Sequence, residues 1–266
     1  MSPLPLCVRL SLWGTKVLIG DVPSAAVDRL VVPDPEDVGD VASVRRHLES
    51  WATFGERVVL AALPHPGHLG GMPPGPHDLM TGAVSAGECV YVPTLGGALV
   101  PVDIGDGPIS GGRWPEGARP GPQIRWEAFD SEPIEPWRLD VLSVREVSRR
   151  LAEDSAAAIG ILAGTHSPWQ SRGLRAVADA ALGSGDLGIP QGIPPATMTL
   201  IADAAATGHA ARLGLTMPDD GTLQEVELRS IALRRLRLVS DQALAAATCI
   251  AALHLAGMRE DRKDDW

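Results

Sequence analysis

The first apolar residues of the chain alternate with polar ones. Leucine or valine occupies positions 6, 8, 10 and 12, and Cys7, Arg9 and Ser11 lie between them. Because successive side chains of a strand point to opposite faces, this period of two indicates a strand with one buried face. Residues 13–16 have the composition of a turn and precede a second apolar run. The pattern therefore predicts a β-hairpin over residues 5–20.

A second pattern runs from residue 57 to residue 92. Arg57 precedes a continuous apolar run that ends at Leu63, which is typical of a strand covered on both faces. Residues 77–86 follow a proline and are predicted to form a short helix, and residues 88–92 a further strand. Residues 57–92 thus resemble a βαβ unit with two parallel strands, although the helix is short for a crossover.

The rest of the first half completes a mixed α/β sheet domain, residues 1–137. Gly96-Gly97 lies between two apolar runs and indicates a hairpin turn. The many Gly and Pro residues of segment 105–122 predict an exposed loop. The other expected elements are a helix over residues 41–54, capped by Asp40, and a final strand over residues 123–129.

From residue 138 onward the pattern is helical. Helix starts are indicated by Ser or Thr followed three residues later by Glu or Gln, or by proline at the first helical position. These signals lie at Ser143–Glu146, Ser167–Gln170, Pro194–Pro195 and Thr222–Glu225. Glu146 with Arg150, and Arg149 with Glu153, have the spacing of ion pairs on the solvent side. We therefore predict a helical bundle of about four helices over residues 138–266, and an α+β fold class for the whole chain.

The last predicted helix, from Thr222 to about Gly257, carries apolar residues on several sides. Such a helix needs more than one cover, and either the bundle itself or a second subunit related by two-fold symmetry supplies it. Its most apolar stretch is Ala243 to Met258. Because a membrane span needs ~20 strongly apolar residues, this shorter stretch favours a buried helix, and we expect no membrane contact.

The charge distribution argues against a nucleic-acid partner. The 266 residues carry a net charge of −10, and residues 1–137 hold 9 basic and 17 acidic side chains. Binding to phosphates requires clustered Lys and Arg, so this acidic half is unsuited to it. The one basic cluster lies on the last helix near carboxylates, which favours a salt-bridged solvated face. It consists of Arg229, Arg234, Arg235 and Arg237.

The cysteines and the amino-terminal segment predict the compartment. Cys7, Cys89 and Cys249 are far apart and form no C-x-x-C pair, which is typical of a reducing environment. The first ten residues lack the basic region and long apolar stretch of a signal peptide. We therefore expect a cytoplasmic protein.

The Gly/Pro/His-rich loop of residues 64–78 is the candidate ligand site. It follows a predicted buried strand, and open α/β sheets bind ligands beyond the carboxyl ends of their strands. The predicted ligand-binding residues are His65, His68, Gly70, Gly71 and His77, where the glycines allow close approach of the backbone. The three histidines together with Asp78 also have the chemistry of a metal site. A structural connector explains the same residues without a ligand.

No catalytic residue is assigned. The chain has no G-x-S-x-G elbow, and the loop has neither a P-loop lysine nor the G-x-G-x-x-G spacing. Ser167 stands before Pro168 and fits a helix cap, and Cys89 and Cys249 lie in apolar segments where cysteine acts as a small hydrophobe. We expect no cofactor.

Two functional hypotheses follow. The first is a non-enzymatic cytoplasmic interaction or regulatory protein that binds a protein partner or forms a homo-oligomer, such as a homodimer, through its helical half. The second is a small-molecule-binding enzyme with its site on loop 64–78 and the helical half as a lid.

Overall fold

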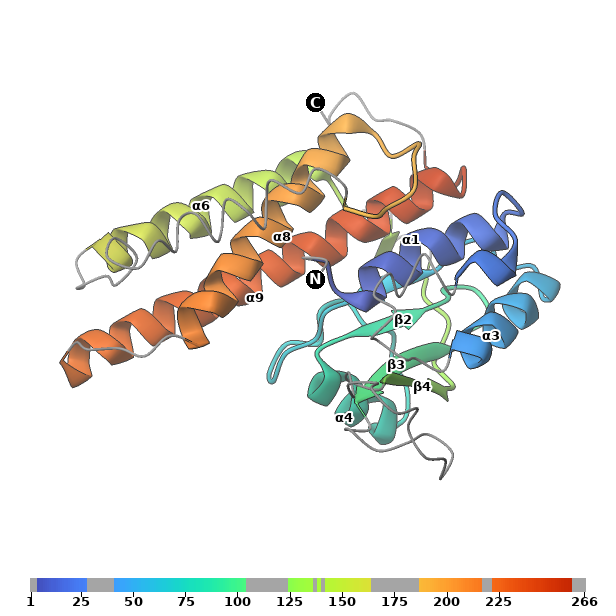
Figure 1. The fold of residues 1–266 in the computed structure, drawn as a ribbon, viewed down its shortest axis with the longest axis horizontal. Coiled ribbons are helices and arrows are strands. Elements are labelled where there is room, and N and C mark those ends of the chain that lie inside the picture. The colour runs from blue at the N-terminus through green and yellow to red at the C-terminus, as the bar shows by residue number, and fades with distance from the viewer. Residues whose placement is uncertain are drawn as a thin grey trace, which may run out of the picture.

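The chain combines a small sheet with long helices. The computed structural model describes residues 4–27, 41–103, 124–135, 138–139, 142–163, 187–216 and 222–259. The sheet and the shorter helices form one end of the molecule, and the long helices α6, α8 and α9 extend from it as an arm (Figure 1). The predicted α+β class, with a sheet-containing first half and a helical second half, is confirmed.

The sheet is antiparallel throughout its described strands. These are β1 (Leu60–Ala62), β2 (Cys89–Tyr91), β3 (Ala98–Asp103) and β4 (Ile124–Phe129), in the order β1-β2-β3-β4. The hairpin predicted at Gly96-Gly97 joins β2 to β3, and the strand predicted over residues 123–129 is β4. The segment 105–122 lies outside the described residues.

The βαβ prediction is wrong. β1 and β2 are antiparallel, with Leu60 opposite Tyr91 and Ala62 opposite Cys89. The predicted helix is present as α4 (His77–Ala86), but it packs against β3 and does not cross over between parallel strands. The apolar run before Pro64 is buried because the helices α1 and α9 pack on β1. Helices can cover an antiparallel strand as fully as a parallel one, so burial did not indicate the strand direction.

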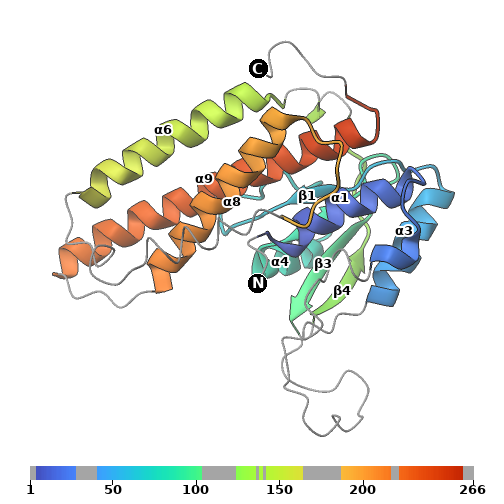
Figure 2. The ribbon, with the colours of Figure 1, turned by 45° about the horizontal axis from the view of Figure 1, so that its top comes forward.

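The hairpin predicted over residues 5–20 is also wrong, because Leu6–Leu18 forms the helix α1. The helix packs against both the sheet and α9 and lies beside α9 in two views (Figures 1 and 2). Nine of its 13 residues are buried, and they include Arg9, Ser11 and Thr15. A helix covered on nearly all sides need not show a period of 3.6, so its alternating residues resembled a half-buried strand.

The amino-terminal end of α1 is capped from a distant part of the chain. Pro5 at the N-cap has no side-chain hydrogen bond to offer. The backbone N–H of Cys7 donates to Oε2 of Glu88 at 2.8 Å instead. A carboxylate at the start of a helix satisfies a free N–H group and interacts favourably with the helix dipole.

The second half contains α6 (Val144–Ala163), α8 (Pro195–Thr216) and α9 (Leu223–Leu255). The capping box predicted at Thr222 and Glu225 is formed in both directions. The helix predicted over residues 41–54 is α3 (Val41–Thr53), and a 3-10 turn, η1, spans Ser24–Ala26. Asp40 and the helix predicted from Ser167 lie outside the described residues.

A single large core joins the two halves across the boundary predicted at residue 137. It contains Val8 of α1, Leu60 of β1 and Leu244 of α9, each almost fully buried. Within the described helices, α9 is the one long and apolar enough to span a membrane by length and composition. In its most apolar window 72% of the residues are buried in the fold, so α9 serves here as the central core helix.

The basic cluster of α9 forms mostly intramolecular contacts. Arg229 is buried and donates to the carbonyl oxygen of Gly214 at 2.9 Å. Arg235 forms an ion pair with Asp154 on α6 at 2.8 Å. These contacts agree with the salt-bridged face expected from the sequence, with the difference that Arg229 is buried.

Candidate functional site

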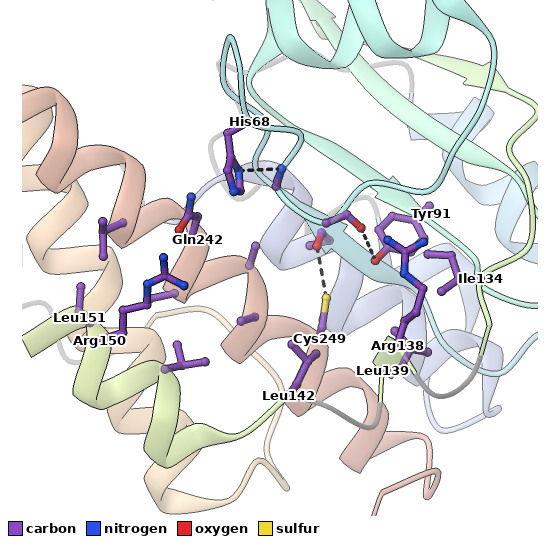
Figure 3. Close-up of a pocket in the computed structure, with 18 residues that line it drawn as sticks. His68, Tyr91, Ile134, Arg138, Leu139, Leu142, Arg150, Leu151, Gln242 and Cys249 are labelled. Atoms are coloured by element: carbon purple, nitrogen blue, oxygen red, sulfur yellow. Dashed lines mark hydrogen bonds between the residues drawn. The ribbon is translucent and has the colours of Figure 1, made fainter. Parts of the chain in front are cut away.

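A cavity of about 340 Å³ lies where the sheet, the loop after β1 and the helices α6 and α9 meet. This volume is at the lower end of the range for small-molecule pockets. Figure 3 shows the cavity between α9 on one side and the sheet on the other. The site is therefore built jointly by the two halves of the chain.

Most of the lining is apolar. Small residues of α9, among them Ala243, Ala245 and Ala246, keep the backbone of α9 close to the cavity. Longer aliphatic side chains come from α6 and from the segment that precedes it. The apolar lining residues are Ala61, Ile134, Leu139, Leu142, Val147, Leu151, Val239, Ala243, Ala245, Ala246 and Cys249.

The polar groups lie at the rim. Arg150 of α6 and Gln242 of α9 are close to one end of the cavity, and Arg138 lies beside Tyr91 at the other (Figure 3). Both arginines and His68 are exposed to solvent. None of the described lining residues is acidic.

The wall formed by Tyr91 and Cys249 is uncharged. The hydroxyl of Tyr91 donates to the carbonyl oxygen of Gly71 at 3.2 Å, and the thiol of Cys249 donates to the carbonyl oxygen of Ala61 at 3.3 Å. Burial raises the pKa of Cys249 to about 11 and holds the pKa of Tyr91 well above its usual value. Both groups are therefore protonated near neutral pH, and neither is an activated nucleophile or base.

The loop after β1 has a tight turn that brings glycines to the cavity. The backbones of His65 and His68 exchange hydrogen bonds of 2.7 and 2.9 Å. Gly70 then adopts a positive φ of 62°, and a Cβ atom at this position would come within 2.7 Å of the carbonyl oxygen of Leu63. Only glycine fits there without displacing the backbone.

The structure divides the five predicted ligand-binding residues into two groups. His68, Gly70 and Gly71 line the cavity. His65 does not, because its Nε2 lies 3.0 Å from Oδ2 of the buried Asp241 on α9. His77 is exposed on α4, where its Nε2 lies 3.3 Å from the hydroxyl of Thr81.

The histidines do not assemble into a metal centre. Among the described residues no group of three or more His, Cys, Asp and Glu side chains is placed to hold a metal ion. His65 belongs instead to a charged cluster in which Asp241 also contacts Arg212 of α8 at 3.3 Å and Arg237 at 3.6 Å. This cluster holds the loop against the helical half.

Several cavity residues were missed by reasoning from the sequence. Arg150 was expected to pair with Glu146, but Glu146 bonds to Arg149, which also forms the predicted pair with Glu153. Arg138, Tyr91 and Gln242 come from separate elements. No local motif connects such residues, so only the packing of α6 and α9 against the sheet identifies them.

Comparison with known proteins assigns the first half of the chain to a protein family. No curated protein and no solved structure gives a significant match. The family described as Rv1486c-like protein, N-terminal domain, matches residues 7–140, just over half of the chain. This range covers all of α1 except Leu6, together with α3, α4 and the whole sheet, and it ends just after the cavity residues Arg138 and Leu139. The chain therefore belongs to the family of Rv1486c-like proteins.

Proposed function

We propose that this protein is a non-enzymatic, cytoplasmic regulatory protein that binds a small molecule with an apolar body in the cavity between the sheet and the helical half. The observation that carries the proposal is the cavity itself, with its apolar lining and a few polar groups at the rim. That combination is characteristic of small-molecule sites. The buried free thiols of Cys7, Cys89 and Cys249 are consistent with a reducing cytoplasm.

We propose a non-enzymatic function because the residues that line the cavity lack activated catalytic groups. Tyr91 and Cys249 form the wall of the cavity, and burial keeps both protonated. No carboxylate lines the described part of the cavity, so no carboxylate–histidine pair is available there. These residues suit retention of a ligand better than its conversion.

A regulatory role fits the position of the cavity. Ligand contacts would come from the loop after β1 on one side and from α6 and α9 on the other. A ligand that binds only this arrangement stabilises it, by a free energy that increases with the logarithm of the ratio of ligand concentration to Kd. The protein would thus report the presence of the ligand through the stability of the contact between its two halves.

Binding of a neutral apolar dye tests this function. Nile red should gain fluorescence with the wild-type protein and lose it with Ala246→Phe, which fills the cavity from α9. The control is Ala156→Phe on α6, an exposed position outside the cavity lining. Circular dichroism verifies that both variants are folded. Equal dye binding by Ala246→Phe and the wild type, or no binding by the wild type, would refute the proposal.

A second candidate function is homo-oligomerisation through the helical arm. Large apolar side chains are exposed where α6 ends and α9 begins, at the far left in Figure 1. They are Ile159, Ile161, Leu223, Leu228 and Ile231. Exposed apolar clusters of this kind are typical of interfaces, and a two-fold dimer is the commonest way to cover them.

Light scattering over a concentration series tests the dimer. We expect the wild type to have twice the chain mass, and the double variant Ile159→Ser/Ile231→Ser to be monomeric. The double variant Ala156→Ser/Ala157→Ser, at exposed small residues of α6, is the control and should remain dimeric. A wild type that is monomeric at all concentrations would exclude this candidate.

A further inference from the structure

The cavity has a positive rim in a strongly acidic protein. The chain carries a net charge of −10, yet the ionisable side chains at the rim are Arg138, Arg150 and His68. No acidic residue is present among the described lining residues to neutralise them. Surface charges more than about 10 Å away are largely screened at physiological salt, so the local charge governs what binds.

Arg149 of α6 and Arg212 of α8 are held by ion pairs, whereas the two rim arginines form none with a described residue. Arg149 bonds to Glu146 and Glu153, and Arg212 contacts Asp241. No ion pair with a described residue is formed by Arg138 or Arg150, although Arg150 is adjacent to Arg149 in the sequence. Their guanidinium groups are available to a ligand.

We propose that the ligand of this cavity is an amphipathic anion, with an apolar body and a carboxylate or phosphate head group. This inference rests on the proposed function, because it concerns the same cavity. The aliphatic side chains of Leu142, Val147 and Leu151 contact the apolar body. The head group binds a rim guanidinium, whose planar fork of N–H donors matches carboxylate and phosphate oxygens.

The rim holds two separate positions for the head group. Arg150 lies near Gln242, whose amide adds a further donor, and Arg138 lies beside Tyr91 (Figure 3). The apolar lining extends between them, so the apolar body of a ligand anchored at either arginine lies along the same surface. Replacement of one arginine should weaken binding, and replacement of both should abolish the preference for an anion.

Isothermal titration calorimetry with a matched pair of probes tests whether the cavity prefers a ligand with a negative charge. Decanoate and 1-decanol share the same apolar chain length and differ in the head group. We expect decanoate to bind roughly 10-fold more tightly than decanol, as for one charge-assisted hydrogen-bonded pair at a partly exposed site. Decyl phosphate in the same assay distinguishes a phosphate from a carboxylate head group, since the tighter of the two anions shows which head group the rim prefers.

Variants then test whether the rim arginines cause the preference for an anion. The ratio of decanoate to decanol affinity should fall by roughly two-fold in Arg138→Gln or Arg150→Gln, because the other arginine still binds the head group, and approach one in the double variant. Arg234→Gln on α9 is the matched control, because Arg234 is exposed and does not line the cavity. Its ratio should equal that of the wild type.

The outcomes separate the two proposals. Equal affinity for decanoate and decanol, with Nile red still bound, would overturn the anion inference and leave the proposed function standing. A preference for decanoate that survives in the double arginine variant would also overturn it. Failure of the wild type to bind Nile red, decanol or the anions would reject the cavity as a ligand site altogether.

Discussion

The backbone N–H of Val59 donates a hydrogen bond to the hydroxyl oxygen of Thr15 at 3.0 Å. The carbonyl oxygen of the same residue accepts from the hydroxyl of Ser11 at 2.6 Å. Val59 directly precedes β1, the first strand in the order of the sheet, and has no strand partner among the described residues. Two hydroxyl groups of α1 thus satisfy the backbone where the sheet ends, which explains why these polar side chains are buried in the core.

The substitution Thr15→Val tests this contact. It keeps the shape of the side chain and leaves the buried N–H of Val59 without an acceptor. The free energy of unfolding, measured in urea, should fall by about 1 to 3 kcal/mol, which is the cost of an unsatisfied buried donor. Thr199→Val, at an exposed position on α8, is the control and should change the stability by less than about 0.5 kcal/mol. Equal effects of the two substitutions would contradict the assignment.

The carboxylate that caps α1 predicts a pH dependence of stability. Burial raises the pKa of Glu88 above its usual value of 4.5. The folded state therefore holds the proton of Glu88 more tightly than the unfolded state, and the stability from this group is full below pH 4.5 and falls as pH rises through the higher folded-state pKa. Glu88→Gln keeps an oxygen to accept from the N–H of Cys7 and removes the titration.

The measurement is the free energy of unfolding of both proteins from pH 4 to pH 8. The wild type should lose stability relative to Glu88→Gln as the pH increases. Glu49→Gln on α3, an exposed position, is a control that should show no such trend. A constant difference between the wild type and Glu88→Gln would show that the folded state does not alter the pKa of Glu88.

The cluster around Asp241 should contribute strongly to stability. Its side chain is only 6% exposed and contacts His65, Arg212 and Arg237. Asp241→Ala removes the shared acceptor and should lower the free energy of unfolding by about 2 to 3 kcal/mol, less than for fully buried pairs because the partners are partly hydrated. Chemical denaturation of Asp203→Ala, an exposed carboxylate on α8, provides the comparison. A similar small effect at both positions would argue against a structural role for the cluster.

Neighbouring glycines at the cavity should respond differently to alanine. Gly70 and Gly71 both have positive φ angles, of 62° and 85°, but only at Gly70 would a Cβ atom meet the backbone, at the carbonyl oxygen of Leu63. Gly71→Ala should cost about 1 to 2 kcal/mol of stability for the left-handed conformation alone. Gly70→Ala should cost more and should also reduce Nile red binding, because the loop must move. Thermal unfolding of the two variants in parallel reveals the difference, and equal melting temperatures would contradict it.

The cysteine in the cavity should be unreactive. With a pKa of about 11, on the order of one Cys249 thiol in a thousand is ionised at pH 8. Iodoacetamide should therefore leave Cys249 unmodified in the folded protein and alkylate it fully in guanidinium chloride, as peptide mass spectrometry would show. Rapid alkylation in the folded state would indicate an activated thiolate and favour an enzyme over a binding protein.

The elements of the chain were predictable where local signals agreed with tertiary packing. Thr222 with Glu225, Pro76, and Gly96 with Gly97 each mark an element boundary through their own backbone or side-chain chemistry. Local signals misled where an element is buried on nearly all sides. In α1, buried polar residues such as Arg9 and Ser11 removed the helical period, because the pattern of apolar residues reports one buried face and α1 has several.

The candidate site was predictable only in part. The loop after β1 was selected for its glycines and histidines, and His68, Gly70 and Gly71 do line the cavity. The reason first given for that position, the carboxyl edge of a parallel sheet, does not apply to an antiparallel one. The loop reaches the cavity because the buried pairing of His65 with Asp241 holds it against α9.

The sequence by itself determined three properties. These are the order of a sheet followed by helices, the first residues of those helices that have a local cap, and the acidic charge of the first half. Those properties depend on neighbouring residues and on composition. Only the tertiary structure decided the strand direction, the helical state of residues 6–18 and the cavity between the halves. Each of these depends on contacts between residues far apart in the chain, such as Glu88 with Cys7 and Ser11 with Val59, and no local pattern records such contacts.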